Sequence, residues 1–395
     1  MSRERAARSK SNRKRRRRIR RGIFSLILVV FIAAAGFGVY RLIDRVFLPE
    51  QASATDDAQS RARRQNEPPA KQEKPVKSDP AEISIVCVGD VIVHSTQITA
   101  ADRGGGNYDF SEYFPHAKPY IESADLAVCN LELTFGGTPY SGYPLFSTPD
   151  QLANVLKDTG FDVGVTANNH MLDRGPSGIG RTIDVAAGAG LLVTGSVKDA
   201  TEKDYLITEV KGVKIGIVAY TYETSVSADN RTINGIGMSA ETRSLINSFG
   251  WASLDADMQA VKQSMDGARA DGAEILICVF HWGNEYERQP NGHQRKAAEM
   301  LVGFGADIIF ASHPHVLQPF ETLTDPETGK RVPVFWSMGN FISNQRRETL
   351  DTSMGKYTEQ GMIARVDLTY DPDSRSITRG RMSCTPTWVD KYSNG

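Results

Sequence analysis

The stretch Glu274–Glu285, EILICVFHWGNE, predicts a buried strand whose end carries chemically useful side chains. Its first residues are almost all apolar and several are β-branched, which is typical of a strand inside an α/β sheet. The apolar run stops at His281, and Glu285 follows it closely. Since ligands of open α/β sheets bind at the carboxyl ends of the strands, this stretch indicates a site at the end of a sheet.

Four further apolar runs end in the same abrupt way. They are ISIVCVGD, LAVCNLE, FDVGVTANNH and ADIIFASHPH, and their terminal polar residues are Asp90, Glu132, Asn169, His170, His313 and His315. Each residue taken alone has a structural interpretation, such as a turn former at Asp90 or a helix cap at Glu132. We expect them to converge, because one shared site explains all five strand ends together.

These residue types predict a metal centre. Carboxylate, amide oxygen and imidazole are ligands for Mn, Fe or Zn, whereas the chain has no Cys-x-x-Cys pair for a thiolate zinc site. We expect one or two divalent metal ions, and the predicted ligands are Asp90, Glu132, Asn169, His281, His313 and His315. His170 adjoins Asn169 and is predicted to act as a general acid for a leaving oxygen.

The remaining histidines and the cysteines are interpreted as structural. Three histidines follow no strand-end pattern: His94, His116 and His293. His94 is the first of them to reconsider, since it lies four residues after Asp90. The four cysteines are interpreted as buried free thiols. A Cys87–Cys129 disulfide stays open as an alternative for a domain outside the cell.

The charge of the chain is strongly segregated. Residues 1–21 carry twelve Arg or Lys and one Glu, so the rest carries −12, because the whole chain has a formal net charge of −1. Residues 22–40 are uncharged and mostly apolar, and would span about 28 Å as a helix. This order predicts one transmembrane helix with a cytoplasmic N-terminus and an extracytoplasmic body.

Two other interpretations of the N-terminal region are weaker. A cleaved signal peptide could end at Ala33-Ala34-Ala35, but the basic and apolar segments are both longer than signal peptides usually have. A nucleic-acid-binding patch is disfavoured because no aromatic residues interleave the arginines. We therefore expect the membrane as a partner and no nucleic acid.

The rest of the chain divides into a tether and one folded domain. Residues 41–80 are predicted to be a disordered tether, since residues 50–80 hold four prolines and almost no large apolar side chains. Residues 81–390 alternate short apolar runs with amphipathic stretches, which predicts a layered α/β domain. A hairpin turning at Lys211-Gly212 makes its sheet mixed. The predicted helices are Pro149–Thr159, Gly178–Ala189, Leu254–Asp271 and Gly292–Gly305.

Six motifs occur in a recognisable order over residues 83–345. They are GDV, NLE, ANNHMLDRG, FHWGNE, GADIIFASHPHVLQPFE and FWSMGNFI. In this order they resemble the poly-γ-glutamate capsule synthesis protein family of the CapA type. That family is similar in turn to the calcineurin-like metallophosphoesterases. The resemblance implies a four-layer α/β/β/α sandwich with a dinuclear metal site.

The resemblance also implies a role for each site residue. Asp90 matches the first-strand aspartate, Glu132 the bridging ligand, and Asn169 the asparagine ligand. His170 matches the proton donor, His281 the single histidine ligand, and His313 and His315 the final His-x-His pair. Two departures weaken one metal site: Ile92 stands where relatives carry a histidine, and Glu132 where many carry Asp.

Two functions of different classes follow from these expectations. The first is an envelope protein in the synthesis, export or anchoring of an anionic polymer such as poly-γ-glutamate, working with other capsule-synthesis membrane proteins. A basic rim for such a polymer is predicted at Arg174, Arg346-Arg347 and Lys356. The second is a metal-dependent phosphodiesterase or phosphatase acting on an envelope or extracellular phosphate ester. A weaker third is a scaffold without catalysis.

Overall fold

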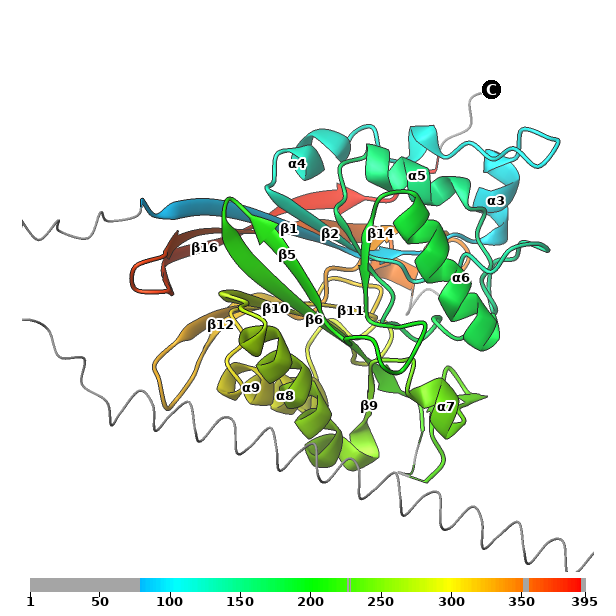
Figure 1. Ribbon diagram of the computed structural model, residues 1–395. Coiled ribbons are helices and arrows are strands. Elements are labelled where there is room, and N and C mark those ends of the chain that lie inside the picture. The colour runs from blue at the N-terminus through cyan, green and yellow to red at the C-terminus, as the bar shows by residue number, and fades with distance from the viewer. Residues whose placement is uncertain (1–78, 226, 228, 351–354, 392–395) are drawn as a thin grey trace, which may run out of the picture. The chain divides into compact units, whose positions relative to one another are not determined.

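The computed structural model of the protein describes residues 79–225, 227, 229–350 and 355–391. The predicted cytoplasmic tail 1–21, transmembrane helix 22–40 and nearly all of the tether 41–80 lie outside the described residues. No helix within the described ranges is long and apolar enough to cross a membrane. The described residues form a mixed α/β fold, which confirms the predicted class (Figure 1).

The first sheet has the strand order β16-β15-β1-β2-β3-β4, with β14 beside β1. Its strands are β1 (Ala81–Val91), β2 (Leu126–Asn130), β3 (Val163–Val165), β4 (Leu192–Thr194), β14 (Asn340–Ile342), β15 (Gln360–Asp371) and β16 (Ser376–Trp388). Strands β1 to β4 are parallel, whereas β15 and β16 are antiparallel to their neighbours. The carboxyl ends of β1, β2 and β3 therefore face the same side of the molecule.

The second sheet has the order β12-β13-β11-β10-β6-β5, with β9 beside β6. Its strands are β5 (Leu206–Val210), β6 (Val213–Glu223), β9 (Ser248–Gly250), β10 (Ile275–His281), β11 (Ile308–Ser312), β12 (Phe320–Thr324) and β13 (Arg331–Phe335). β5 and β6 form the predicted antiparallel hairpin. Lys211 and Gly212 turn with φ of 51° and 81°, a conformation that glycine adopts without strain.

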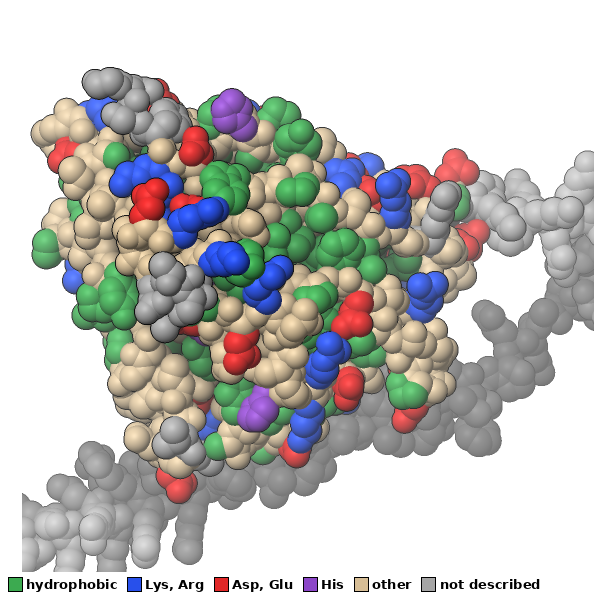
Figure 2. Space-filling view, turned by 180° about the vertical axis from the view of Figure 1, so that it is seen from behind, with side chains coloured by type: hydrophobic (Ala, Val, Ile, Leu, Met, Phe, Trp, Pro, Cys, Tyr) green, Lys and Arg blue, Asp and Glu red, His purple; other side chains and the backbone are tan. Residues whose placement is uncertain are grey.

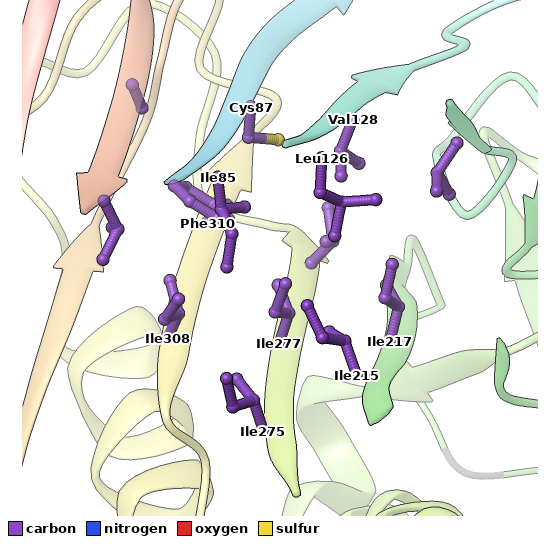
Figure 3. Packing of buried hydrophobic residues seen from close by; sticks show 14 of the residues in the cluster. Ile85, Cys87, Leu126, Val128, Ile215, Ile217, Ile275, Ile277, Ile308 and Phe310 are labelled. Atoms are coloured by element: carbon purple, nitrogen blue, oxygen red, sulfur yellow. The ribbon is translucent and has the colours of Figure 1, made fainter. Parts of the chain in front are cut away.

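The two sheets pack face to face around an apolar core. Ile85 and Val128 from the first sheet meet Ile277 and Phe310 from the second, all of them at most 1% exposed (Figure 3). Alternation along each strand sends every second side chain into this layer, because successive side chains of a strand point to opposite faces. The other face of each sheet builds a separate apolar cluster against helices.

Helices cover both outer faces of the paired sheets (Figure 1). The helices are α3 (Ser95–Ala101), α4 (Lys118–Glu122), α5 (Gln151–Asp158), α6 (Gly175–Gly188), α7 (Ala240–Arg243), α8 (Leu254–Ala270) and α9 (Gly292–Gly303). In α8 the buried residues recur at helical spacing, which explains why this segment is an amphipathic helix on the second sheet. All four predicted helices are present, and none of their ends is shifted by more than three residues.

The cysteines are free thiols, as expected, and the alternative Cys87–Cys129 disulfide is wrong. β1 and β2 are parallel neighbours in which Cys87 pairs with Val128 and Val88 with Cys129. One register position separates the two cysteines, so Cys87 points into the layer between the sheets and Cys129 into the cluster outside. Burial raises the pKa of both thiols, which keeps them protonated and unreactive.

The layer between the sheets predicts unequal costs for two similar substitutions. Leu126 on β2 is 2% exposed and Leu192 on β4 of the same sheet is 42% exposed. We expect Leu126→Ala to lower the free energy of unfolding by about 2–5 kcal/mol, because it leaves a cavity. Leu192→Ala is the matched control and should cost clearly less. Urea unfolding followed by circular dichroism measures both, and equal losses would contradict the proposed position of the core.

Candidate metal centre

The predicted site residues from both sheets meet at the carboxyl ends of the central strands. Asp90 lies near the end of β1, Glu132 follows β2, and His281 is the last residue of β10. His313 and His315 follow β11, the neighbour of β10. Asn169 follows β3. All six predicted ligands are at most 3% exposed. Oδ1 of Asn169 lies 2.8 Å from Nε2 of His281, and the other five belong to the two groups described next, so the structure brings the whole set together.

The cluster contains two groups of three side chains whose donor atoms lie within 4.8 Å of one another. One group is Glu132, His281 and His313, and the other is Asp90, Glu132 and His315. Glu132 belongs to both, with its Oε1 3.8 Å from Nε2 of His281 and 3.8 Å from Nε2 of His315. This geometry suits a carboxylate shared between two cations.

Glu132 is the least satisfied group of the cluster. It is fully buried, and no N–H or O–H within the described ranges donates a hydrogen bond to either carboxylate oxygen. Burial raises the pKa of Glu132 well above its usual range, and the neighbouring Asp90 carboxylate adds to this. A buried carboxylate without a donor is costly unless a cation compensates its charge. The residues present therefore fit a divalent metal ion.

The imidazoles of His281 and His313 have the protonation state that a ligand needs. Burial lowers the pKa of both well below the usual value, and the neighbouring histidines lower it further. Both rings are therefore neutral at physiological pH and have a nitrogen lone pair available. Nδ1 of His313 has no hydrogen-bond partner within the described ranges, and its Nε2 lies 3.1 Å from the Tyr222 hydroxyl.

His315 is oriented by the aspartate of the first strand. Its Nδ1 donates to Oδ2 of Asp90 at 3.1 Å, which leaves Nε2 directed towards Glu132. Burial alone would lower the pKa of His315, but the Asp90 hydrogen bond and charge outweigh it and raise the pKa. A carboxylate that fixes the ring of a ligand histidine is common around metal ions.

The loop that carries the His-x-His pair has an unusual backbone. His313 and His315 have φ of 106° and 57°, a region that few residues other than glycine occupy. The backbone N–H of Tyr286 donates to the Pro314 carbonyl at 2.8 Å and holds the loop. Conformations of this kind persist only where surrounding structure enforces them, and they gather at functional sites.

His170 lies beside the cluster and is paired with an aspartate that the sequence prediction did not include. Nδ1 of His170 lies 2.8 Å from Oδ2 of Asp173, which also accepts the backbone N–H of Phe146 at 2.7 Å. The Phe146 ring packs edge-on against the imidazole. With Nδ1–H donated to Asp173, Nε2 of His170 is the nitrogen available for proton transfer.

Four polar residues around the site were missed. Their positions are Asn130, Tyr222, Asn234 and Asn340. Asn130 donates to Asp90 at 2.8 Å, and Asn340 Oδ1 lies 3.1 Å from His315 Nδ1. Asn130 belongs to the NLE motif and Asn340 to the FWSMGNFI motif, so the sequence could have predicted that both lie near the site.

Asn234 was less predictable, because it comes from a separate hairpin. β7 (Thr232–Ile233) and β8 (Ile236–Gly237) are joined by Asn234 and Gly235, both at positive φ, a common hairpin turn. The hairpin brings Asn234 Nδ2 to 3.4 Å from His170 Nδ1. The Asn-Gly pair predicts the turn, but nothing in the sequence predicts that this turn lies next to His170.

One glycine is required for the neighbourhood of Asp90. A Cβ atom added to Gly89 would lie 1.8 Å from the Gly339 carbonyl oxygen. The close approach lets the Asp90 N–H donate to that oxygen at 3.0 Å, so that β14 runs beside β1. Asn340 is thereby placed next to Asp90 and His315, which explains why glycines precede both polar residues.

The histidines interpreted as structural lie outside the two metal-capable groups. Nδ1 of His94 accepts the Asn344 N–H at 3.1 Å, and burial lowers the pKa of His94 to about 4. His293 packs against Trp251. Of the two open glutamates, Glu321 accepts the Trp336 indole N–H at 2.8 Å and pairs with Arg295, away from the cluster. Glu285 is exposed, and its charge contributes to the raised pKa of Glu132.

The arginines of the predicted basic rim make contacts within the fold. Arg346 is buried and lies 3.1 Å from Glu359, and Arg347 lies 3.0 Å from the other oxygen of the same carboxylate. The Arg347 guanidinium also stacks over Trp388. Arg174 donates to the Pro139 carbonyl. Arg346 is therefore withdrawn from the surface, whereas the Arg347 side chain is 51% exposed.

Comparison with known proteins identifies a family match and distant structural relatives. A family model described as "Bacterial capsule synthesis protein PGA_cap" matches residues 84–345. The chain is 27% identical over 294 residues to the capsule biosynthesis protein CapA of Bacillus anthracis, covering 72% of this chain and 66% of that one. It is 28% identical over 285 residues to the PGA biosynthesis protein CapA of Bacillus subtilis, covering 70% and 67%. The match thus spans about two thirds of the length of these relatives.

Among solved structures, the calcineurin-like phosphoesterase YfkN from Bacillus subtilis aligns with a TM-score of 0.44 and 14% identity, covering 78% of this chain and 91% of that one. A phosphatase from Mycoplasma pneumoniae aligns with a TM-score of 0.43 and 12% identity, covering 79% and 96%.

The geometry around Glu132 predicts which histidines control metal content. We expect the wild-type protein to copurify with, or take up, Mn, Fe or Zn, and His281→Ala or His313→Ala to lose most of it, because each removes a donor atom from one group of three. His293→Ala removes an exposed imidazole elsewhere and serves as the matched control. Inductively coupled plasma mass spectrometry after dialysis measures the content. Equal metal loss in the control, or none in any variant, would argue against this centre.

Proposed function

This chain belongs to the bacterial capsule synthesis protein family PGA_cap, and on that premise we propose a function at the cell envelope. The proposed protein is membrane-anchored and extracytoplasmic, and assists synthesis, export or anchoring of an anionic capsule polymer such as poly-γ-glutamate. It carries a metal-dependent hydrolase-like site in a sandwich of the metallo-dependent phosphatase type. The proposed metal ligands are those predicted: Asp90, Glu132, Asn169, His281, His313 and His315.

One observation supports the hydrolytic part of the proposal more strongly than the others do. A buried carboxylate without a hydrogen-bond donor, Glu132, is shared by two groups of metal-capable side chains. Structural carboxylates in protein interiors are normally paired or hydrogen-bonded. The cluster has imidazole and carboxylate donors but no thiolate, which suits Mn, Fe or Zn. A bound divalent ion would supply Lewis acidity towards an oxygen of the substrate.

The side chains around the cluster supply the rest of the chemistry. His170 would give a proton from Nε2 to the leaving group, which is the amine nitrogen of a γ-glutamyl amide or the oxygen of a phosphate ester, while Asp173 holds Nδ1 and stabilises the charged ring. Asn234 borders the Nδ1 side of the same imidazole, with its Nδ2 3.4 Å from that nitrogen. Phe146 covers the ring and keeps water from that side. The proton donor thus stands next to the metal ligands without belonging to them.

The location at the envelope rests on the sequence and on the relatives. A basic segment followed by nineteen uncharged residues favours a membrane anchor with the domain outside the cytoplasm. Two relatives are named for capsule or PGA biosynthesis, and such polymers lie outside the cell membrane. Other capsule-synthesis membrane proteins are the expected partners.

A second function is favoured by the His170–Asp173 pair. An imidazole held by a carboxylate next to two metal-capable groups suits protonation of an alkoxide or phenoxide leaving group. This arrangement is what a phosphodiesterase or phosphatase acting on an envelope or extracellular phosphate ester requires. The polymer function and the phosphoesterase function differ in substrate and share the same residues.

Parallel assays of two substrates test the proposal. The full-length protein with added Mn²⁺ is given bis-p-nitrophenyl phosphate, followed by absorbance, and a γ-linked polyglutamate, followed by its chain length. Turnover of bis-p-nitrophenyl phosphate should fall about 100-fold in His170→Ala, the lower end of what a general acid contributes, because p-nitrophenolate leaves readily. Shortening of the polymer should fall by at least as much, because an amine leaves only when it is protonated. His116→Ala, at an exposed histidine, should retain wild-type rates.

The pattern of outcomes separates the functions. Shortening of the polymer favours the capsule function, and phosphodiester turnover without polymer shortening favours the phosphoesterase. Bound metal with no turnover of either substrate would refute the hydrolytic part and leave a scaffold. Turnover that survives both His170→Ala and His313→Ala would show that the reaction occurs elsewhere.

A further inference from the structure

The hairpin beside the metal centre belongs to a segment that is anchored at both of its ends. Residues 231–243, which we call the hairpin segment, hold β7, β8 and α7. Arg231 stands at the start of this segment and Arg243 at its end. Both guanidinium groups pair with the same two carboxylates, those of Glu223 and Asp257. Since Glu223 is the last residue of β6 and Asp257 lies on α8, the segment is fixed to the second sheet and its helix layer.

These ion pairs differ from those at the surface of the domain. On the face drawn in Figure 2, many Lys and Arg side chains lie next to Asp or Glu side chains at the surface, and exposed pairs of this kind stabilise a fold little. The Glu223 side chain, in contrast, is 0% exposed, and Arg231 reaches it at 2.9 Å and Asp257 at 2.6 Å. Loss of Arg231 would leave two carboxylates with one cation, Arg243. Because an unpaired buried charge is costly, Arg231 holds the segment firmly.

The hairpin segment also packs on the chain that follows His170. Ile233 is fully buried and belongs to an apolar cluster with Met171, Leu172 and Ile179. This cluster is separate from the three larger apolar clusters of the domain. The hairpin segment therefore reaches from the second sheet to the loop after β3 of the first sheet.

At the tip of the hairpin, Asn234 contacts the imidazole of the proposed proton donor. Its amide nitrogen lies 3.4 Å from Nδ1 of His170, the nitrogen that Asp173 holds at 2.8 Å. The Phe146 ring packs edge-on against the same imidazole. The ring cannot turn away from Asp173 without displacing the Asn234 amide, so the direction of Nε2 depends on the hairpin.

His170 and the histidines of the metal centre come from different sheets. His170 follows β3 of the first sheet, whereas His281 ends β10 and His313 follows β11 of the second. Their separation therefore depends on contacts between the two sheets at this end of the fold. Glu223 adjoins Tyr222, whose hydroxyl lies 3.1 Å from Nε2 of His313. The hairpin segment is thus anchored beside a metal-ligand contact and ends on the proton donor.

We propose that the hairpin segment sets the position of His170 relative to the metal ligands, with Arg231 and Asn234 as positioning residues for proton transfer. The effect on turnover rests on the proposed hydrolytic function. A general acid contributes about 100- to 10,000-fold, and only when its proton lies within hydrogen-bond reach of the leaving group. A displacement of about 1 Å is enough to lose much of such a contribution. Arg231 acts through the hairpin and Asn234 through its contact with the ring.

Two phosphodiesters with different leaving groups test the positioning role in the full-length protein. Arg231→Gln weakens the anchor, and Asn234→Gly removes the amide at a φ of 49° that glycine adopts without strain. With Mn²⁺ added, we expect kcat for diphenyl phosphate to fall about tenfold in each variant, and kcat for bis-p-nitrophenyl phosphate to fall clearly less. Phenolate is the more basic leaving group and needs the proton more. KM and metal content should stay at wild-type values.

A control and a double-variant cycle complete this experiment. Arg269→Gln breaks an arginine–carboxylate pair with Asp307, which precedes β11 at the end away from the metal centre, and should leave both rates unchanged. In the His170→Ala background, neither hairpin variant should lower turnover further, because both act through that imidazole. Asn234→Gly leaves the anchor intact, so it decides the question even if Arg231→Gln destabilises the whole domain.

Amide hydrogen exchange followed by mass spectrometry tests the position of His170 without any turnover. We expect Arg231→Gln to speed exchange in residues 231–243 and also in residues 170–175, because the second stretch loses its support. Exchange in β10 and β11 should stay as slow as in the wild type. Arg269→Gln should change neither of the first two stretches.

Several outcomes would overturn the inference. Equal loss of turnover for both esters would show a general structural role, and a further loss in the His170→Ala background would show that the hairpin acts on something else. Fast exchange confined to residues 231–243 would show that His170 is held without the hairpin. A wild type that turns over neither ester would refute the proposed hydrolytic function, and exchange at residues 170–175 would then decide the positional inference.

Discussion

The structure depends on how one buried charge, that of the Glu132 carboxylate, is compensated. Its two oxygens are buried where two sheets meet, without a hydrogen-bond donor from any described residue. Three histidines and an aspartate surround it, and these residues come from β1, β10 and the loop after β11. A buried carboxylate of this kind destabilises a fold unless it is neutralised. A divalent cation meets that demand, so the binding of metal and the stability of this end of the molecule are linked.

Parallel pairing of β1, β2 and β3 in one sheet and of β6, β10 and β11 in the other places the metal-capable residues at one end of the fold. The loop of His313 and His315 at this end has backbone in a region that few residues other than glycine occupy.

The sequence predicted the active end of the fold better than the surfaces around it. Apolar runs that stop at Asp90, His281 or His315 reveal buried strands and their ends. A buried strand needs apolar side chains, and a metal-capable site at its end needs a polar residue there. Short helices such as α4 have too few turns to show a period. β16 was missed because its residues, SITRGRMSCTPTW, are polar, and its pairing with β15 supplies the stability that its composition does not.

Surface charge was the least predictable property. The Arg346-Arg347 pair looks like a free basic patch in the sequence, but both guanidinium groups share the buried Glu359 carboxylate, which balances part of their charge. Asp173 lay three residues from His170 and was overlooked, because the spacing alone does not show that the turn closes on the ring.

Anomalous diffraction from crystals grown with Mn²⁺ would test the central claim most directly. The account predicts an anomalous peak about 2.2 Å from a Glu132 carboxylate oxygen, and a second peak about 3.5–4 Å from the first if both groups of three are filled. A well-ordered Glu132 that accepts hydrogen bonds from water or protein, with manganese peaks confined to other parts of the surface, would contradict it.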